Sequence, residues 1–309
     1  MRWKVFYVFL GFFIGLVVLF GFMLFGIENP FRLSLVKKVI DYTVAKTLPE
    51  TFCSLVVGQD GIKPARSDTV MLLFINTRIG EALLFSIPRD ARLSIPGVGQ
   101  DKVNHAYARG GVALLKKAVE EALGLEIPYF VEINYDGFEK VIDALGGVEI
   151  EVEKPLRYVD KAQDLYINIP AGKQVLNGRK ALQYVRFRHD PLGDIGRIKR
   201  QQTFIQALLT KVNDPSVLMN VSTIVEELKK SVNTNLSSED IVQLAIWFRG
   251  LEEKRLITET MPGKPIYANG ISFWEPDLSA AREFIQNFLT KEKESFGEQK
   301  DPDGSQKSG

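Results

Sequence analysis

Charged residues gather in short clusters along this 309-residue chain, at positions where an α/β domain would place strand ends and helix starts. Carboxylate oxygens bind Mg²⁺ and planar guanidinium groups grip phosphate, so the mixture suits a divalent metal bound to a polyanion. The pattern predicts a diphosphate site. The clusters are Gly58-Gln59-Asp60, Arg66-Ser67-Asp68-Thr69, Ser86-Ile87-Pro88-Arg89-Asp90, Asp101-Lys102-Val103-Asn104-His105-Ala106-Tyr107, Tyr184-Val185-Arg186-Phe187-Arg188 and Arg197-Ile198-Lys199-Arg200-Gln201-Gln202.

Asp60 and Asp68 are the candidate metal ligands. Asp60 follows the first predicted strand and Asp68 begins the second, so a returning loop brings both carboxylates to one edge of the sheet. Arg66 lies in that loop, and Arg89 leaves the third strand at the same edge. Ligands of open α/β sheets gather at strand ends of this kind. The alternative is a pair of loop aspartates that only cap backbone amides.

The later clusters also have usable spacing. If a helix ends near Val185, Arg186 and Arg188 share one side of the extended segment that follows. Arg197 and Gln201 are four residues apart in the next predicted helix, so they face the same way, near an N-terminus that offers backbone N–H groups to an anion. Each arginine alone could be a solvated surface residue. Six cations together favour a site: Arg66, Arg89, Lys102, Arg186, Arg188 and Arg197.

The sequence lacks the motifs of other common catalytic classes. The chain has two histidines, His105 and His189, and no Gly-x-Ser-x-Gly elbow, which argues against a serine hydrolase. His105 is interpreted as a hydrogen-bonding residue at a helix start. P-loop and Gly-x-Gly-x-x-Gly motifs are absent from the sequence, which excludes P-loop NTPases and Rossmann dinucleotide enzymes. Gly110-Gly111 is interpreted as a helix entry turn.

Composition limits the possible partners. The net charge of +1 argues against a general nucleic-acid binder, because such proteins carry a strongly basic face. Cys53 is the only cysteine, so neither an intrachain disulfide nor a cysteine metal cage can form.

The segments around these clusters alternate between short apolar runs and amphipathic stretches. We therefore expect an α/β fold in which a central mixed β-sheet is flanked by helices. A hairpin turn is expected at residues 77–80. Predicted strands cover 52–58, 69–76, 82–87, 128–133, 148–153, 156–159, 165–169 and 255–261, and predicted helices cover 111–123, 136–145, 178–187, 198–212, 216–230, 238–249 and 278–290.

The N-terminus predicts a membrane anchor. Residues 5–27 carry no charge and would span about 34 Å as a helix, enough to cross a bilayer. A cleavable signal peptide is the alternative, but its apolar core is shorter and ends in a small-residue cleavage site. By the positive-inside rule, Arg2 and Lys4 predict that residues 1–4 stay in the cytoplasm and that everything after residue 28 is exported. A connector at 28–50, one domain at 51–290 and a disordered tail at 291–309 follow.

The ordered motifs resemble the LytR-CpsA-Psr family of cell-wall glycopolymer transferases. They are Gly-x-Asp, Arg-Ser-Asp-Thr, Ser-Ile-Pro-Arg-Asp, Asp-Lys-Val-Asn-His-Ala-Tyr-Ala-x-Gly-Gly, Gly-Gly-Val, Leu-Asn-Gly-x-x-Ala-Leu-x-Tyr-Val-Arg-x-Arg and Asp-x-x-Arg-x-x-Arg-Gln-Gln. The resemblance is strong over about residues 52–212 and weaker to about 290. It implies the α-β-α domain of that family.

The resemblance also implies an activity. The enzyme would move a glycopolymer from a polyprenyl-diphosphate carrier to peptidoglycan or another wall acceptor, with Mg²⁺, or else Mn²⁺, as cofactor. The lipid bilayer would hold the anchor, and an apolar channel built by the buried strands and by helices 111–123 and 136–145 would take the lipid tail. Asp60 and Asp68 would hold the metal, and the diphosphate would lie on Arg66, Arg89, Lys102, Arg186, Arg188, Arg197 and Gln201.

Several assignments stay open at this level. Arg89 is the candidate catalytic arginine, and Asp90 either orients it or accepts the proton of the acceptor hydroxyl. Gln201 and Gln202 cannot be separated. Two other functions would use the same site: a hydrolase of lipid diphosphates, and a membrane-anchored regulator that binds a lipid diphosphate without turning it over. The two predicted metal carboxylates argue against the regulator.

Overall fold

The structure is a computed structural model that describes residues 48–60, 66–161, 165–189, 193–214, 217, 221–268 and 270–291. The predicted cytoplasmic segment 1–4, the anchor 5–27, most of the connector 28–50 and all but the first residue of the tail 291–309 lie outside these residues. None of the helices within the described ranges has both the length and the apolar character needed to span a bilayer.

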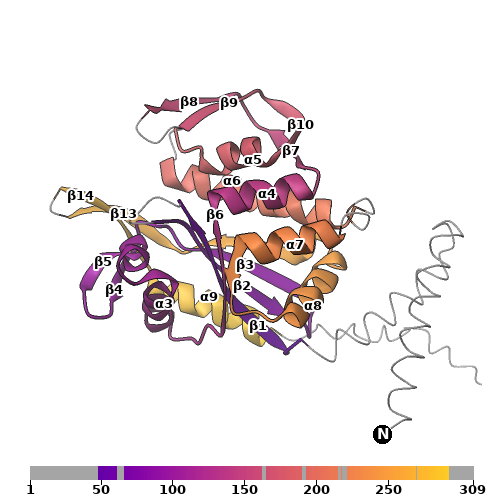
Figure 1. Cartoon of the computed structure of the whole chain (residues 1–309). Helices are drawn as coiled ribbons and strands as arrows, with labels where there is room; N and C mark the ends of the chain where they lie inside the picture. Colours follow the sequence, from indigo (N-terminus) through magenta and orange to yellow (C-terminus); the bar gives the residue numbers. More distant parts are fainter. Residues whose placement is uncertain are drawn as a thin grey trace, which may run out of the picture. The chain divides into compact units, whose positions relative to one another are not determined.

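A six-stranded mixed sheet forms the centre of the domain, with strand order β11-β6-β1-β2-β3-β12. β1 pairs antiparallel with β2, and β2 with β3, whereas β6 and β12 join β1 and β3 in parallel. The sheet is visible edge-on below the upper helices in Figure 1. Its strands are β1 (Thr51–Gln59), β2 (Ser67–Asn76), β3 (Glu81–Ser86), β6 (Tyr129–Asn134), β11 (Val232–Thr234) and β12 (Leu256–Thr260).

Helices cover both faces of this sheet, because its central strands are apolar on both sides. In β1, Leu55 and Val57 pack in the core formed with α3 (Val103–Leu123) and α9 (Leu278–Thr290). Phe52 and Val56 point the other way, into a core formed with α6 (Gly193–Val212) and α8 (Ser238–Arg249). The predicted fold class, a mixed sheet flanked by helices, is confirmed.

An upper layer completes the domain (Figure 1). Here α4 (Tyr135–Ala144), α5 (Gly178–Arg186), α6 and α7 (Val221–Ser231) share a separate apolar core with two small antiparallel ribbons. β7 (Val148–Val152) pairs with β10 (Gly172–Leu176), and β8 (Leu156–Asp160) pairs with β9 (Leu165–Ile169). In β7 and β9 buried and exposed residues alternate strictly, so each rests one face on the helices.

Several elements differ from the sequence prediction. The helix predicted at 111–123 begins at Val103, and the Gly110-Gly111 pair is a kink inside it rather than its entry turn, with Gly111 at φ 61°. Strand β10 was not predicted. Two hairpins were not predicted: β4 (Arg92–Ile95) with β5 (Gly99–Lys102), and β13 (Gly263–Ala268) with β14 (Ile271–Pro276). β11 was missed as well.

Candidate functional site

A cavity of about 630 Å³ lies between the central sheet and the helices of the upper layer. One part of its wall is charged, and the nine residues predicted for the metal and the diphosphate line the cavity together with Asp90, which was predicted to be catalytic. They are Asp60, Arg66, Asp68, Arg89, Asp90, Lys102, Arg186, Arg188, Arg197 and Gln201. The structure therefore brings together residues that lie between positions 60 and 201 of the chain.

Apolar residues make up a large part of the remaining cavity lining. Val56, Met71 and Ile133 contribute from the sheet, and the other apolar residues come from α4, α5, α6 and β9. The lining includes residues of the helix predicted at 136–145, as expected for the predicted channel, but within the described residues it contains none of 111–123. The apolar lining comprises Val56, Met71, Ile133, Phe138, Val141, Ile142, Leu165, Leu182, Val185, Ile205 and Leu208.

A β-bulge sets the direction of Asp68. Gly58 pairs with Thr69, but the next pair joins Gln59 to Ser67, so β2 carries Asp68 as one extra residue. Regular alternation would turn Asp68 away from Thr69, onto the face packed against α3. Bulges re-aim side chains beside active sites. Asp68 and Thr69 accordingly line the same cavity.

Asp68 lies at the centre of an ionic network. Its Oδ1 lies 2.5 Å from Nη1 of Arg89 and 3.7 Å from Nη1 of Arg197. Its Oδ2 accepts a hydrogen bond from the Tyr135 hydroxyl at 2.6 Å. Burial acts to raise the pKa of Asp68, but the two arginines and the tyrosine outweigh it, so the pKa is lowered. Asp68 is therefore held as a carboxylate.

Asp194 joins the two arginines of this network from the first turn of α6. Its Oδ1 lies 2.6 Å from Nη2 of Arg197 and 3.5 Å from Nε of Arg89. Arg197 is only 3% exposed, and burial lowers its pKa against the opposing effect of Asp194. The Nε atoms of Arg89 and Arg197 are both buried and make no hydrogen bond within the described residues. Buried donors of this kind call for an acceptor.

Asp90 contacts two cations of the site. Its Oδ1 lies 2.8 Å from Nζ of Lys102, and its Oδ2 lies 4.0 Å from Nε of Arg89. The β13–β14 hairpin supports this corner, because Trp274 donates its backbone N–H to the Asp90 carbonyl. The ring of Phe273 lies 5.5 Å from Nζ of Lys102. Of the two roles predicted for Asp90, these contacts favour the orienting one.

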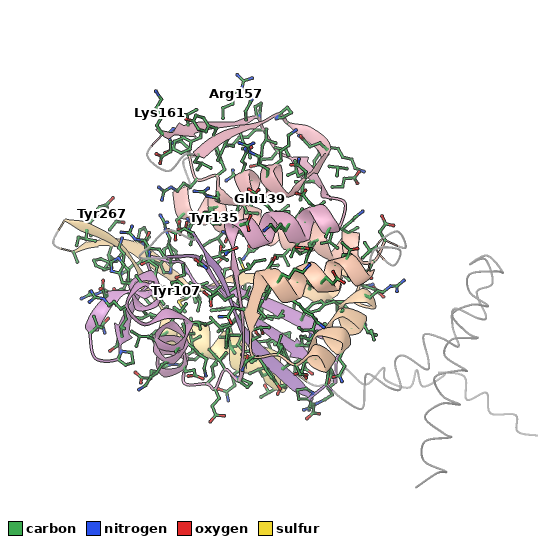
Figure 2. The ribbon with its side chains drawn as sticks, in the orientation of Figure 1. Tyr107, Tyr135, Glu139, Arg157, Lys161 and Tyr267 are labelled. Carbon is green, nitrogen blue, oxygen red and sulfur yellow. The ribbon has the colours of Figure 1, made fainter. Side chains whose placement is uncertain are left out.

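Arg186 reaches the cavity from the last residue of α5. Its guanidinium group lies over the ring of Tyr135, 4.3 Å from the centroid. Figure 2 shows Tyr135 at the start of α4, beside the ends of the sheet strands. Tyr135 thus contacts both an arginine of the predicted diphosphate set and Asp68. The ring thus holds the guanidinium group at the cavity through a cation–π contact.

The structure separates the two adjacent glutamines. Gln201 lines the cavity and donates to the Thr69 hydroxyl at 2.9 Å. Gln202 lies beneath it and donates to the Ser86 hydroxyl at 3.1 Å and to the Glu259 carbonyl at 3.2 Å. Gln202 therefore ties α6 to β3 and β12, whereas Gln201 faces the site.

The donor set fits one mode of magnesium binding. Within the described ranges, no cluster of three or more His, Cys, Asp or Glu side chains is arranged to hold an ion. Mg²⁺ is commonly bound by one or two carboxylates, with phosphate oxygens and waters completing its octahedron. Asp60 and Asp68 line one charged wall, and each carboxylate oxygen has a second lone pair. The two residues suit a metal shared with a phosphate ligand.

Sequence reasoning missed two members of the site. Tyr135 follows β6, which runs parallel to β1, so its position at the carboxyl edge of the sheet was an available signal. Asp194 precedes Arg197 by three residues, a spacing that favours an ion pair on one helix face.

Comparisons with known proteins agree on one family. Residues 36–290 match the LytR_cpsA_psr family. The Staphylococcus aureus regulatory protein MsrR is 36% identical over 220 residues, which cover 69% of this chain and 65% of that protein. In Enterococcus faecalis, the polyisoprenyl-teichoic acid–peptidoglycan teichoic acid transferase TagU is 34% identical over 238 residues, or 75% of this chain and 76% of that protein.

A solved structure, TagT bound to LIIa-WTA, has the same fold. Its TM-score is 0.68 at 31% identity, and the alignment covers 78% of this chain and 91% of that one. The chain spans about 65% of the length of the MsrR proteins that it matches. The chain belongs to the LytR-CpsA-Psr family.

Proposed function

We propose that this chain is a membrane-anchored phosphotransferase that moves a glycopolymer from a polyprenyl-diphosphate carrier to a peptidoglycan-type wall acceptor. One observation carries the proposal: a single cavity combines a cluster of arginines and aspartates with a large set of apolar lining residues. A diphosphate linked to a long hydrocarbon has the same division of polarity. The names of TagU and of the TagT complex support this choice of substrate.

Charge neutralisation and positioning would carry the reaction. A hydroxyl of the acceptor attacks the sugar-linked phosphate, and polyprenyl phosphate leaves. Arg66, Arg89, Lys102, Arg186, Arg188, Arg197 and Gln201 would hold the diphosphate. Arg89 and Arg197 each have a buried Nε donor without a hydrogen bond, which a phosphate oxygen would satisfy. Mg²⁺ on Asp60 and Asp68, or Mn²⁺ in its place, would supply Lewis-acid stabilisation of the developing charge when bound.

The apolar N-terminal segment places this chemistry at the outer face of the cell membrane. Residues 5–27 would anchor the protein, with residues 1–4 in the cytoplasm and the domain at 51–290 outside. Protease added to intact spheroplasts should then remove the domain. A domain that stays protected until the membrane is opened would contradict this topology.

The assay for the proposed function uses the full chain in detergent with a polyprenyl-diphosphate-linked saccharide, a peptidoglycan fragment and Mg²⁺. Mass spectrometry should find the saccharide joined to the fragment through a phosphodiester, with release of polyprenyl phosphate. Release of polyprenyl phosphate and a phosphosaccharide without an acceptor product would instead identify a lipid-diphosphate hydrolase. Binding without turnover would identify a regulator, the function that the name of MsrR suggests.

The metal assignment has a readout that does not depend on turnover. Mg²⁺ should strengthen binding of the lipid diphosphate to the wild type in calorimetry, because the ion would bridge carboxylates and phosphate. In the Asp60→Asn/Asp68→Asn double variant the affinity should no longer respond to Mg²⁺. An unchanged response in that variant would place the metal elsewhere.

A further inference from the structure

Asp101 and His105 form a carboxylate–imidazole pair on the cavity wall. Nδ1 of His105 lies 2.8 Å from Oδ1 of Asp101, across the junction between β5 and α3. The same Oδ1 accepts the backbone N–H of Lys102 at 2.8 Å, and Nη2 of Arg109 donates to Oδ2 at 3.2 Å. Three donors thus hold the Asp101 carboxylate, one of them the imidazole itself.

This arrangement selects one tautomer of the imidazole. Burial acts to raise the pKa of Asp101, but the hydrogen bonds from the Lys102 backbone and from His105 outweigh it and lower the pKa. An ionised carboxylate can only accept hydrogen bonds, so Nδ1 of His105 carries the proton. In the neutral imidazole Nε2 is then the unprotonated acceptor, and no described residue contacts that atom through a hydrogen bond.

His105 lines the cavity that holds the proposed metal and diphosphate residues. Asp60, Arg66 and Lys102 line the same cavity, and Lys102 lies three residues before His105 at the start of α3. Its side chain remains 40% exposed, so a ligand entering from solvent can reach it. The imidazole is therefore both beside the charged wall and open to an acceptor.

The carboxylates of the wall are less suited to take a proton. Asp68 is bound by Arg89 and Arg197, and its lowered pKa makes it a weak base. Asp90 is paired with Lys102 at 2.8 Å. Asp60 accepts the backbone N–H of Arg66 and is the second proposed metal ligand. Asp160 is the remaining carboxylate that lines the cavity.

We propose that His105 is the general base of the transfer and that Asp101 orients it, an inference that rests on the proposed function. Nε2 takes the proton of the acceptor hydroxyl as its oxygen bonds to the sugar-linked phosphorus. The bond from that phosphorus to the bridging oxygen breaks, and its electron pair leaves with polyprenyl phosphate. Asp101 stabilises the positive charge of the imidazolium while it carries this proton, and the imidazolium then releases the proton to solvent.

The test uses the full chain in detergent and compares His105→Asn with the wild type. The asparagine amide nitrogen sits near the position of Nδ1, so it can still donate to Asp101 while the base at Nε2 is lost. If His105 only supported the structure through its bond to Asp101, the rate of transfer would be unchanged in this variant. A general base contributes about 100-fold or more, so we expect the rate of transfer to fall by at least that factor, with unchanged donor affinity and melting temperature.

Two further measurements identify the base. In His105→Ala, added imidazole should restore part of the rate. The wild-type rate should fall on the acid side of its pH profile, as expected for a reaction that needs one general base, and His105→Asn should lose that dependence. The charged groups around the ring are Asp101 and Arg109 at its Nδ1 side and Asp60, Arg66 and Lys102 along the cavity wall, and all of them stay in place in both variants.

Controls separate the possible failures. His189→Asn, at the exposed second histidine, should keep the full rate. Asp101→Asn should slow transfer, and combining it with His105→Asn should add nothing, because Asp101 acts through the ring. If His105→Asn stays within threefold of the wild type, or if Asp160→Asn alone produces the loss and the altered pH profile, His105 is not the base. A wild type that transfers nothing would refute the proposed function itself.

Discussion

Arg197 offers the sharpest test of the ionic network, because it is both buried and paired. We expect Arg197→Ala to lower the free energy of unfolding as well as ligand affinity. Its guanidinium group lies 2.6 Å from Asp194 and 3.7 Å from Asp68, and the residue is only 3% exposed. Removing one partner of a buried pair typically costs 3–5 kcal/mol, since the other charge is left without compensation.

The expected magnitude lies at the low end of that range. Asp194 keeps a fifth of its side-chain surface exposed, and Arg89 remains 3.5 Å from it, so part of its charge stays compensated. We therefore expect a loss of about 3 kcal/mol. For a domain of this size, each kcal/mol shifts the melting temperature by roughly 2–4 °C, so the midpoint should fall by roughly 6–12 °C.

Thermal unfolding followed by circular dichroism measures this change, and calorimetry with a polyprenyl diphosphate measures affinity on the same samples. Arg179→Ala is the matched control, because Arg179 is exposed and lines no part of the cavity; it should change stability by less than about 0.5 kcal/mol. If Arg197→Ala has the melting temperature of the wild type but binds the polyprenyl diphosphate far more weakly, then Arg197 only contacts the ligand and the ionic network does not stabilise the fold.

Three further outcomes follow from single residues. Gln202→Ala should destabilise the domain by about 2 kcal/mol in urea unfolding, because it removes buried hydrogen bonds, whereas Gln201→Ala should mainly weaken binding of a lipid diphosphate in calorimetry. Burial raises the pKa of Cys53 to about 12, so iodoacetamide at pH 8 should modify the native thiol at least roughly tenfold more slowly than the unfolded one, as mass spectrometry can follow. Folding lowers the pKa of Asp68 from its ordinary 3.8, so the ionised carboxylate stabilises the folded state. This contribution to the free energy of unfolding is complete well above pH 3.8 and is lost as the pH falls through the folded pKa. The free energy of unfolding, measured as a function of acid pH, should therefore vary less in Asp68→Asn than in the wild type.

The central sheet could be predicted because its strands are buried on both faces and read as continuous apolar runs. The β13–β14 hairpin gives no such signal. Its residues bond mainly to each other, one strand contains Pro265, and Tyr267 is 81% exposed and projects from the ribbon in Figure 2. A ribbon that buries little apolar surface leaves no hydrophobic period in the sequence.

Most members of the site could be predicted from their types, but Tyr135, Asp194 and the pairing between residues could not. Both Arg89 and Tyr135 bind Asp68 from positions 21 and 67 residues away, and only the folded sheet brings them together. The bulge that turns Asp68 toward the cavity is a one-residue change of register, invisible to a pattern of alternating burial. His105 was interpreted as a helix-start residue, and its contact with Asp101 at the start of α3 agrees with that, but its place on the cavity wall depends on tertiary structure.

The pairing pattern divides the six cations of the wall into two groups with different tasks. Arg89, Lys102 and Arg197 are each held by aspartates, so their charges are largely balanced before any ligand arrives. Arg66, Arg186 and Arg188 have no ion pair with a carboxylate among the described residues, and Arg186 instead lies over the ring of Tyr135. If the ligand is the proposed diphosphate, its negative charge would be balanced mainly by the second group. The paired cations would then fix the geometry of the wall in the absence of ligand. The unpaired ones would supply the excess positive potential that attracts the ligand, and their contribution should weaken with added salt far more than that of the buried pairs.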